Sequence, residues 1–181
     1  MALAIHGHVA AYLHKDFDLA FRRFETALRV NPSSAPAWLW SAAANAWIGN
    51  GPGAVEEINP AISLSPYDPL MYAYTTVAGM AHLADVQYER AAECGLRSIA
   101  QNTTYAATYQ LLILALVLAG REVEAQPYIP QLLEAELGFT VERYRRRFPG
   151  SATPTGQLYC EALYQVPLIR TDVPSRAGRL T

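Results

Sequence analysis

The chain has 181 residues, of which 51% are apolar and only 17% charged, against roughly 25% charged in an ordinary globular domain. Its net charge of −2 gives no electrostatic reason to expect direct binding to nucleic acid or to an anionic membrane. The longest apolar run, which begins at Leu111, is too short to span a bilayer, and the first residues lack the basic region of a signal peptide. The two distant cysteines, Cys94 and Cys160, fit a reducing compartment. We therefore expect a cytoplasmic protein.

Apolar residues recur at helical spacing in eight segments, which form four consecutive pairs. Each pair has a turn between its helices, and glycine occupies two of these turns, at Gly49 and Gly120, where a positive φ costs little. Prolines inside the second helices, at Pro60, Pro127 and Pro130, remove backbone hydrogen bonds, so we expect these helices to bend. The sequence predicts an all-α fold without a sheet and with helices at 3–14 and 18–30, 37–48 and 53–64, 72–84 and 88–101, and 106–119 and 122–135.

The pairs repeat at a nearly constant interval. Ala20 and Ala54 lie 34 residues apart, as do Ala91 and Ala125, whereas the interval from Ala54 to Ala91 is 37. Closing prolines recur at the same spacing, at Pro32 and Pro66, and small residues recur where the two helices of a pair would cross, as at Ala42 and Gly79.

This pattern, with Trp38 four residues into its unit, resembles the tetratricopeptide repeat. The resemblance covers residues 1–137 and divides them into units at about 1–34, 35–68, 69–105 and 106–137. It implies a right-handed superhelical solenoid of about four units, in which stacking buries the apolar face that one unit cannot bury alone. His8 occupies a position where a small residue is usual, so we expect the first unit to pack loosely.

The first helices of the units place a second face on the concave side of such a solenoid. This face carries no lysine or arginine, which argues against the capture of a C-terminal carboxylate known in the family. An apolar stripe of this length is an aggregation hazard unless something covers it. We predict a partner-binding groove, filled by the C-terminal segment, another chain or a ligand, and lined by Ile5, Val9, Tyr12, Trp40, Ala43, Trp47, Met80, Leu83, Gln110, Leu114 and Val117.

All three tryptophans lie between residues 38 and 47, and helical geometry separates them. Trp38 and Trp40 are about 200° apart at 100° per residue, whereas Trp40 and Trp47 fall on one stripe. We expect Trp38 to be almost fully buried between helices. Trp40 and Trp47 are expected to line the concave face and to contact either residues 154–166 or another chain.

The region 138–168 contains a basic segment and then an amphipathic helix that begins near Pro154. This helix is expected to cap the last unit or to fill the groove of its own chain or of a neighbour. Residues 169–181 are predicted to form a poorly ordered tail. The basic run predicts a solvated helix end or, as an alternative, a patch for an acidic partner, made of Arg143, Arg145, Arg146 and Arg147.

Chemical motifs are missing from the sequence pattern. The four histidines lack the i, i+4 pairing of metal ligands on a helix, and the glycines at 49–53 lack the lysine of a phosphate-binding loop. No nucleophile–base set stands out either. We therefore predict a chain that is not an enzyme and has no catalytic residues, metal or cofactor.

The repeats contain the segments SAPAWLWSAAANAWIG, LSPYDPLMYAY and GFTVERYRRRFP. In these segments the sequence also resembles the C-terminal repeat region of bacterial multidomain regulators, in which an adenylate cyclase or winged-helix domain precedes the repeats. That resemblance implies a regulatory or scaffold portion, either cut from a longer protein or encoded alone. The leading hypothesis is a protein-interaction module, which we expect to form a homodimer because of its low charge, apolar inner face and uncapped first unit. The alternative is a sensor that binds a small apolar molecule in the concave groove.

Overall fold

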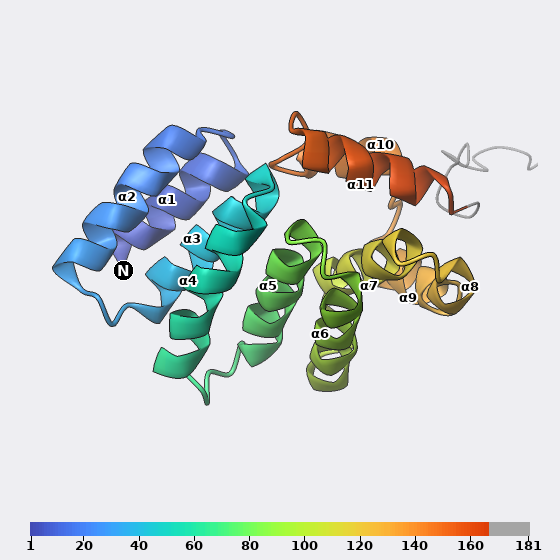
Figure 1. The fold of residues 1–181 in the computed structure, drawn as a ribbon, viewed down its shortest axis with the longest axis horizontal. Coiled ribbons are helices and arrows are strands. Elements are labelled where there is room, and N and C mark those ends of the chain that lie inside the picture. Colours follow the sequence, from blue (N-terminus) through green and yellow to red (C-terminus); the bar gives the residue numbers. More distant parts are fainter. Residues whose placement is uncertain (167–181) are drawn as a thin grey trace, which may run out of the picture.

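A computed structural model describes residues 1–166 and contains helices but no strand in this range (Figure 1). The all-α prediction is confirmed, and the predicted helix pairs agree with the observed ones to within a few residues. The predicted tail, 169–181, lies outside the described residues, as do residues 167 and 168. The helices are α1 (Ala2–Tyr12), α2 (Phe17–Val30), α3 (Ala35–Ile48), α4 (Gly51–Leu64), α5 (Met71–Ala84), α6 (Tyr88–Gln101), α7 (Ala106–Leu118), α8 (Glu122–Ala125), α9 (Tyr128–Ala135), α10 (Val141–Arg147) and α11 (Pro154–Tyr164).

Local side chains fix several helix ends. The Asp16 side chain accepts a hydrogen bond from the Leu19 N–H at 2.9 Å, and the Thr153 hydroxyl accepts one from the Gly156 N–H at 3.1 Å. Such caps satisfy N–H groups that the first helical turn leaves without a partner. At the other end of α3, Gly49 adopts a left-handed conformation with φ 84°, which lets the chain turn directly into α4.

The helices pair as α1/α2, α3/α4 and α5/α6, and each pair packs against the next along the chain. Small residues make these crossings possible. A Cβ added to Gly79 would lie 2.4 Å from a methyl carbon of Leu111, and one added to Gly7 would lie 2.6 Å from the ring of Phe24. The small residue of the first unit is therefore Gly7, one position before His8, and the loose packing predicted from His8 is wrong.

The fourth unit departs from the other three. After α7 the predicted helix 122–135 is broken into α8 and α9, because Pro127 has no N–H to donate to the carbonyl of Val123. In contrast, Pro60 lies inside α4, which runs unbroken from Gly51 to Leu64.

Helix α7 is the centre of the C-terminal half, and all seven of its residues from Leu111 to Val117 are buried. It is apolar on every side because α5, α6, α8, α9 and α11 all pack against it. The core of the N-terminal half is built mainly from alanines of α1 to α5, among which stand larger side chains such as Phe24, Leu39 and Trp47. Every helix within residues 1–166 is too short or too polar to traverse a bilayer.

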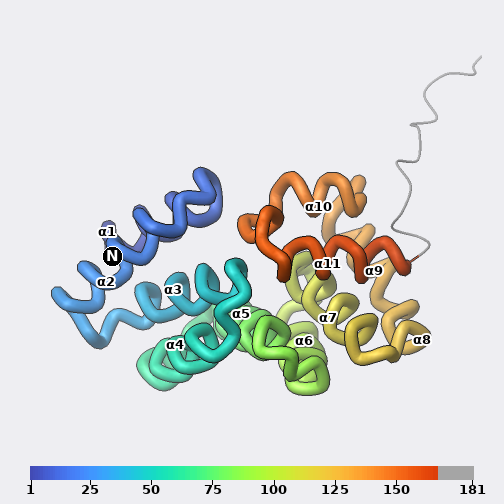
Figure 2. The backbone as a smooth tube through the Cα atoms, turned by 45° about the horizontal axis from the view of Figure 1, so that its top comes forward, coloured from blue at the N-terminus to red at the C-terminus, as the bar shows by residue number. Residues whose placement is uncertain are grey.

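The C-terminal helices fold back over the solenoid. Helix α11 packs on α7 and touches α3, and α10 packs on α11, so that the two stand opposite the first helix pair (Figure 2). The turn between α1 and α2 reaches this segment: the Lys15 Nζ donates to the Ser151 Oγ at 2.9 Å and to the Arg146 carbonyl at 3.3 Å. The first helices of the four units, which are α1, α3, α5 and α7, thus surround an internal space together with the α10–α11 segment.

Candidate functional site

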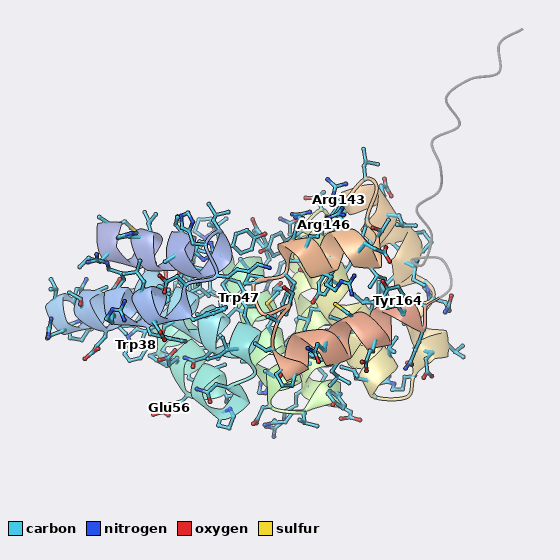
Figure 3. All side chains as sticks on the ribbon, turned by 90° about the horizontal axis from the view of Figure 1, so that it is seen from above. Trp38, Trp47, Glu56, Arg143, Arg146 and Tyr164 are labelled. Atoms are coloured by element: carbon cyan, nitrogen blue, oxygen red, sulfur yellow. The ribbon has the colours of Figure 1, made fainter. Side chains whose placement is uncertain are left out.

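This space is a cavity of about 350 Å³ on the inner face of the solenoid. Its walls come from α1, α3, α5 and α7, and residues from the end of α9 to α11 cover it, including Phe148, Pro149 and Tyr159 of α11. Figure 3 shows Trp47 near the middle of the molecule, between the N-terminal helices and the C-terminal segment. Apolar and aromatic side chains make up most of the lining, as in sites for small molecules or single side chains.

Most of the residues predicted for a partner-binding groove come together in this cavity. Ile5 and Val9 lie on α1 outside the lining, and Val117 is buried in the core. Ile5 and Val9 do not line the cavity because His8 and Tyr12 are the α1 residues that face it, and Val117 does not because it is packed in the core around α7. The predicted residues that do line it are Tyr12, Trp40, Ala43, Trp47, Met80, Leu83, Gln110 and Leu114.

Aromatic rings form the wall nearest α1. The His8 imidazole stacks on the Trp40 indole with ring centroids 4.0 Å apart, and Tyr12 packs on Trp47 at 5.7 Å. Burial lowers the pKa of His8 below its usual value, because a charged imidazole loses its hydration there. The neutral imidazole is therefore the form that this wall presents near pH 7.

Trp40 and Trp47 both line the cavity on the inner face, as expected, whereas Trp38 does not have the burial predicted for it. Trp38 is only half-buried, and it lies on the outer side of α3 in a shallow groove with Phe21 and Glu57. Its indole N–H donates to the Pro32 carbonyl at 2.9 Å, which holds the ring at the edge of the helix pair. Trp47, at 7% exposure, is the buried indole instead.

The C-terminal segment reaches the inner tryptophans mainly through the loop before α11. Gly150 lies against the end of α3 so closely that a Cβ on it would be 1.7 Å from the Trp47 carbonyl oxygen. Tyr159 of α11 lines the same cavity as Trp40 and Trp47. Of the predicted segment 154–166, Tyr159 thus faces the two indoles across the cavity, and the loop 148–150, which the sequence did not single out, makes the close approach to Trp47.

Charged groups at the cavity neutralise each other. Glu136 accepts a hydrogen bond from the Gln110 Nε2 at 2.7 Å and forms an ion pair with Arg147. The Glu136 side chain is only 14% exposed, so this pairing offsets the cost of its burial. Among residues 1–166, the cavity lining therefore presents no unpaired charge to a guest.

Two residues that line the cavity each carry a buried polar atom that has no hydrogen-bond partner among residues 1–166. They are the hydroxyl of Tyr159, a residue that is only 4% exposed, and the Nδ1 atom of His8. Burial also raises the pKa of Tyr159, so the phenol stays protonated. An unpaired buried hydroxyl costs about 1–3 kcal/mol, and such exceptions in native structures call for an explanation.

The sequence alone did not indicate several of these residues. His8 occupies a position where the repeat pattern expects a small residue, and Tyr105, Glu136 and Tyr159 belong to no motif. Their one signal was the polar or aromatic character that they share among apolar neighbours.

The four arginines of the predicted acidic-partner patch have different surroundings. Arg143 donates to the carbonyls of Leu137 and Gly138, and Arg147 pairs with Glu136 at the cavity. Arg145 and Arg146 are exposed, and neither forms an ion pair within residues 1–166. Arg143 and Arg146 lie near each other at the edge of the molecule (Figure 3). In the same range, no three His, Cys, Asp or Glu side chains cluster as metal ligands would.

No protein-family model matches the chain, and no curated protein matches it significantly. The solved structures that resemble it include two of MamA, an all-helical protein of the tetratricopeptide-repeat type. One has a TM-score of 0.58 at 22% identity and covers 83% of this chain and 88% of its own; the other has a TM-score of 0.57 at 18% identity, with 100% of both chains covered. At this identity the likeness concerns the fold: the chain is an all-α helical-repeat solenoid of the tetratricopeptide type.

Proposed function

We propose that this chain is a non-enzymatic protein-interaction module that binds a segment of a partner protein along the inner face of its solenoid. The observation that carries the proposal is the cavity, which lies where the first helices of all four units converge and which is lined mostly by apolar and aromatic side chains. Buried aromatic anchors that enter such hollows contribute most of the affinity in many protein interfaces.

The surface beside the cavity extends this apolar region. On α1, Tyr12 at the cavity edge is 37% exposed, and Ile5, two turns earlier on the same side of the helix, is 51% exposed. A segment longer than one residue would cover this stripe while one of its side chains enters the cavity. The arginines Arg145 and Arg146 add a basic region that an acidic part of a partner could contact.

Selection of peptides from a phage-displayed random library tests the proposal. Peptides that bind the full chain should lose affinity when Tyr12→Ala removes the ring at the cavity edge. Tyr67→Ala is the matched control, because Tyr67 is 97% exposed in the loop between α4 and α5, away from the cavity. Binding that survives Tyr12→Ala, or a library that yields no binder, would contradict the proposed function.

A small-molecule sensor is the second candidate. The cavity volume of about 350 Å³ lies at the lower end of the range of roughly 300–1,000 Å³ for ligand pockets. Saturable quenching of tryptophan fluorescence by a metabolite or lipid would favour it over a peptide-binding role.

The proposal also covers the cellular location, the larger protein and the oligomeric state of the module. We infer that the module works in the cytoplasm as the regulatory or oligomerisation part of a bacterial signalling or transcriptional regulator. Homodimerisation at micromolar concentration is part of this inference, supported by the exposed apolar side chains of Ile5 and Leu13 on the first unit. Analytical ultracentrifugation that shows only a monomer at that concentration would count against the dimer.

A further inference from the structure

We propose that the cavity receives an uncharged aromatic side chain with a hydrogen-bonding tip, that of a tyrosine in the partner segment, and that the Tyr159 hydroxyl pairs with that tip. The inference deepens the proposed function and rests on it, because it names the chemistry of the residue that anchors the partner.

Size and lining favour an aromatic guest. The cavity of about 350 Å³ has room for one large side chain, and its α1 wall is made of the stacked rings of His8 and Trp40 with Tyr12 on Trp47. Aromatic rings pair favourably in stacked or edge-on arrangements beyond the area that they bury. A planar ring therefore gains more from this wall than an aliphatic chain of equal volume.

Charge excludes an ionised guest. Glu136 and Arg147 already neutralise each other, and the imidazole of His8 and the phenol of Tyr159 are both uncharged near neutral pH. Moving an ion from water into this cavity would leave it without a free counter-charge, which is strongly unfavourable. The guest is therefore neutral.

The unpaired Tyr159 hydroxyl specifies a polar tip. Tyr159 lines the cavity and is only 4% exposed, and its buried hydroxyl has no partner among residues 1–166. A phenol both donates and accepts hydrogen bonds, so it can pair with the hydroxyl of a guest tyrosine. A guest phenylalanine would leave the Tyr159 hydroxyl unpaired.

The adjoining surface favours a peptide as the source of the ring. The exposed stripe from Tyr12 to Ile5 continues outward from the cavity, so residues flanking the tyrosine have an apolar surface to cover. A free aromatic molecule would leave that stripe exposed. We therefore assign the guest to a partner segment.

Capped amino acids test the assignment directly. We expect N-acetyl-tyrosinamide to bind the full chain more tightly than N-acetyl-phenylalaninamide, by roughly threefold to tenfold for one added hydrogen bond. N-acetyl-phosphotyrosinamide should not bind, because it carries a charge. Ligand-observed NMR measures these weak affinities. If the phosphorylated probe binds as well as the tyrosine probe, or the tyrosine probe does not bind at millimolar concentration, the inference is wrong.

Variants of the protein locate the contact. In Tyr159→Phe the preference for the tyrosine probe over the phenylalanine probe should disappear. In the matched control Tyr109→Phe it should persist, because Tyr109 is equally buried at 3% exposure but its hydroxyl already donates to the Thr103 carbonyl at 2.8 Å. A preference that survives Tyr159→Phe would overturn the assigned pairing.

Longer probes separate a peptide from a free molecule and separate this inference from the proposed function. N-acetyl-Leu-Tyr-Leu-amide should bind more tightly than N-acetyl-Gly-Tyr-Gly-amide, and Ile5→Ser should remove the gain. No gain from the leucines would overturn the peptide source and favour an enclosed small molecule. A further outcome is that library peptides bind in a Tyr12-dependent manner while Tyr159→Phe leaves the preference for the tyrosine probe unchanged. That result would support the proposed function and refute the tyrosine anchor.

Discussion

The polar groups on the two sides of helix α3 differ in whether they have hydrogen-bond partners. In the outer groove, the Trp38 indole donates to the Pro32 carbonyl, the Asn45 Nδ2 donates to a Glu57 carboxylate oxygen at 2.8 Å, and the Asn50 Nδ2 donates to the Asn45 Oδ1 at 2.7 Å. On the inner side, the buried Tyr159 hydroxyl and the His8 Nδ1 atom have no partner within residues 1–166. The outer side is thus complete as it stands, whereas the inner side leaves hydrogen-bonding capacity unused.

This difference distinguishes polar groups that stabilise the fold from those that are available to a guest. Native proteins satisfy nearly all of their buried polar atoms, and the outer groove follows that rule. Both sides carry a tryptophan and both are hollowed, so neither the residue type nor the shape separates them. What separates the two sides is whether their buried polar atoms have hydrogen-bond partners.

The largest effect should come from removing the indole of Trp47, compared with removing that of Trp38. Trp47→Ala should lower the free energy of unfolding by about 3–5 kcal/mol, because a buried indole is lost from the core. Trp38→Ala should cost only about 1–2 kcal/mol, because the ring is half-exposed and loses one hydrogen bond. Urea unfolding followed by circular dichroism compares them, and an equal or larger loss for Trp38→Ala would break the comparison.

Gly150→Ala should have the next largest effect. The added Cβ would overlap the Trp47 carbonyl, which belongs to the α3 backbone and cannot move aside, so the cover of the cavity must shift. We expect a loss of roughly 1–3 kcal/mol and faster amide hydrogen exchange in α11. Ser151→Ala is the control, since it removes only the bond from Lys15 and should stay within about 0.5 kcal/mol of the wild type. Unchanged exchange in α11 for Gly150→Ala would show that the loop does not anchor the cover.

Two buried tyrosines test the meaning of an unpaired hydroxyl. Tyr109→Phe removes a hydrogen bond to the Thr103 carbonyl and should cost about 1 kcal/mol. Tyr159→Phe removes a hydroxyl without a partner, so the free protein should keep its stability or gain slightly. Thermal melts of both variants measure the difference. A similar loss in the two would mean that the Tyr159 hydroxyl is already satisfied in solution.

The smallest effect concerns pH. Burial lowers the pKa of His8 in the folded chain, so the unfolded chain binds a proton more readily there. Stability should therefore fall as the pH drops below about 6.5, the usual pKa of histidine, and level off below the lowered pKa. His8→Phe keeps a ring against Trp40 but cannot titrate, so its stability should fall less over this interval. His82, whose pKa burial also lowers, is present in both proteins and cancels in the difference. Parallel pH profiles of stability for the wild type and His8→Phe would refute a lowered pKa of His8.

The sequence by itself determined the helices and their repetition. Helical periodicity, Asp16 and Thr153 as caps and Gly49 as a stop act over a few residues, so their outcome can be read without knowing the rest of the chain. The recurring small residues also fixed the pairing, since only close crossing explains them. Of the predicted cavity lining, the positions on α3, α5 and most of α7 followed from this local geometry.

Tertiary structure alone decided which groups meet at the cavity. His8 and Tyr159 are 151 residues apart, and they share a cavity because the C-terminal helices fold back on α7 and α3, where Lys15 and Gly150 make contacts across the molecule. The tertiary packing also decided how deeply the tryptophans are buried, since it left Trp38 half-buried and Trp47 only 7% exposed. Such contacts depend on the accumulated rotation between units, to which every helix crossing contributes a little, and no local pattern records that sum.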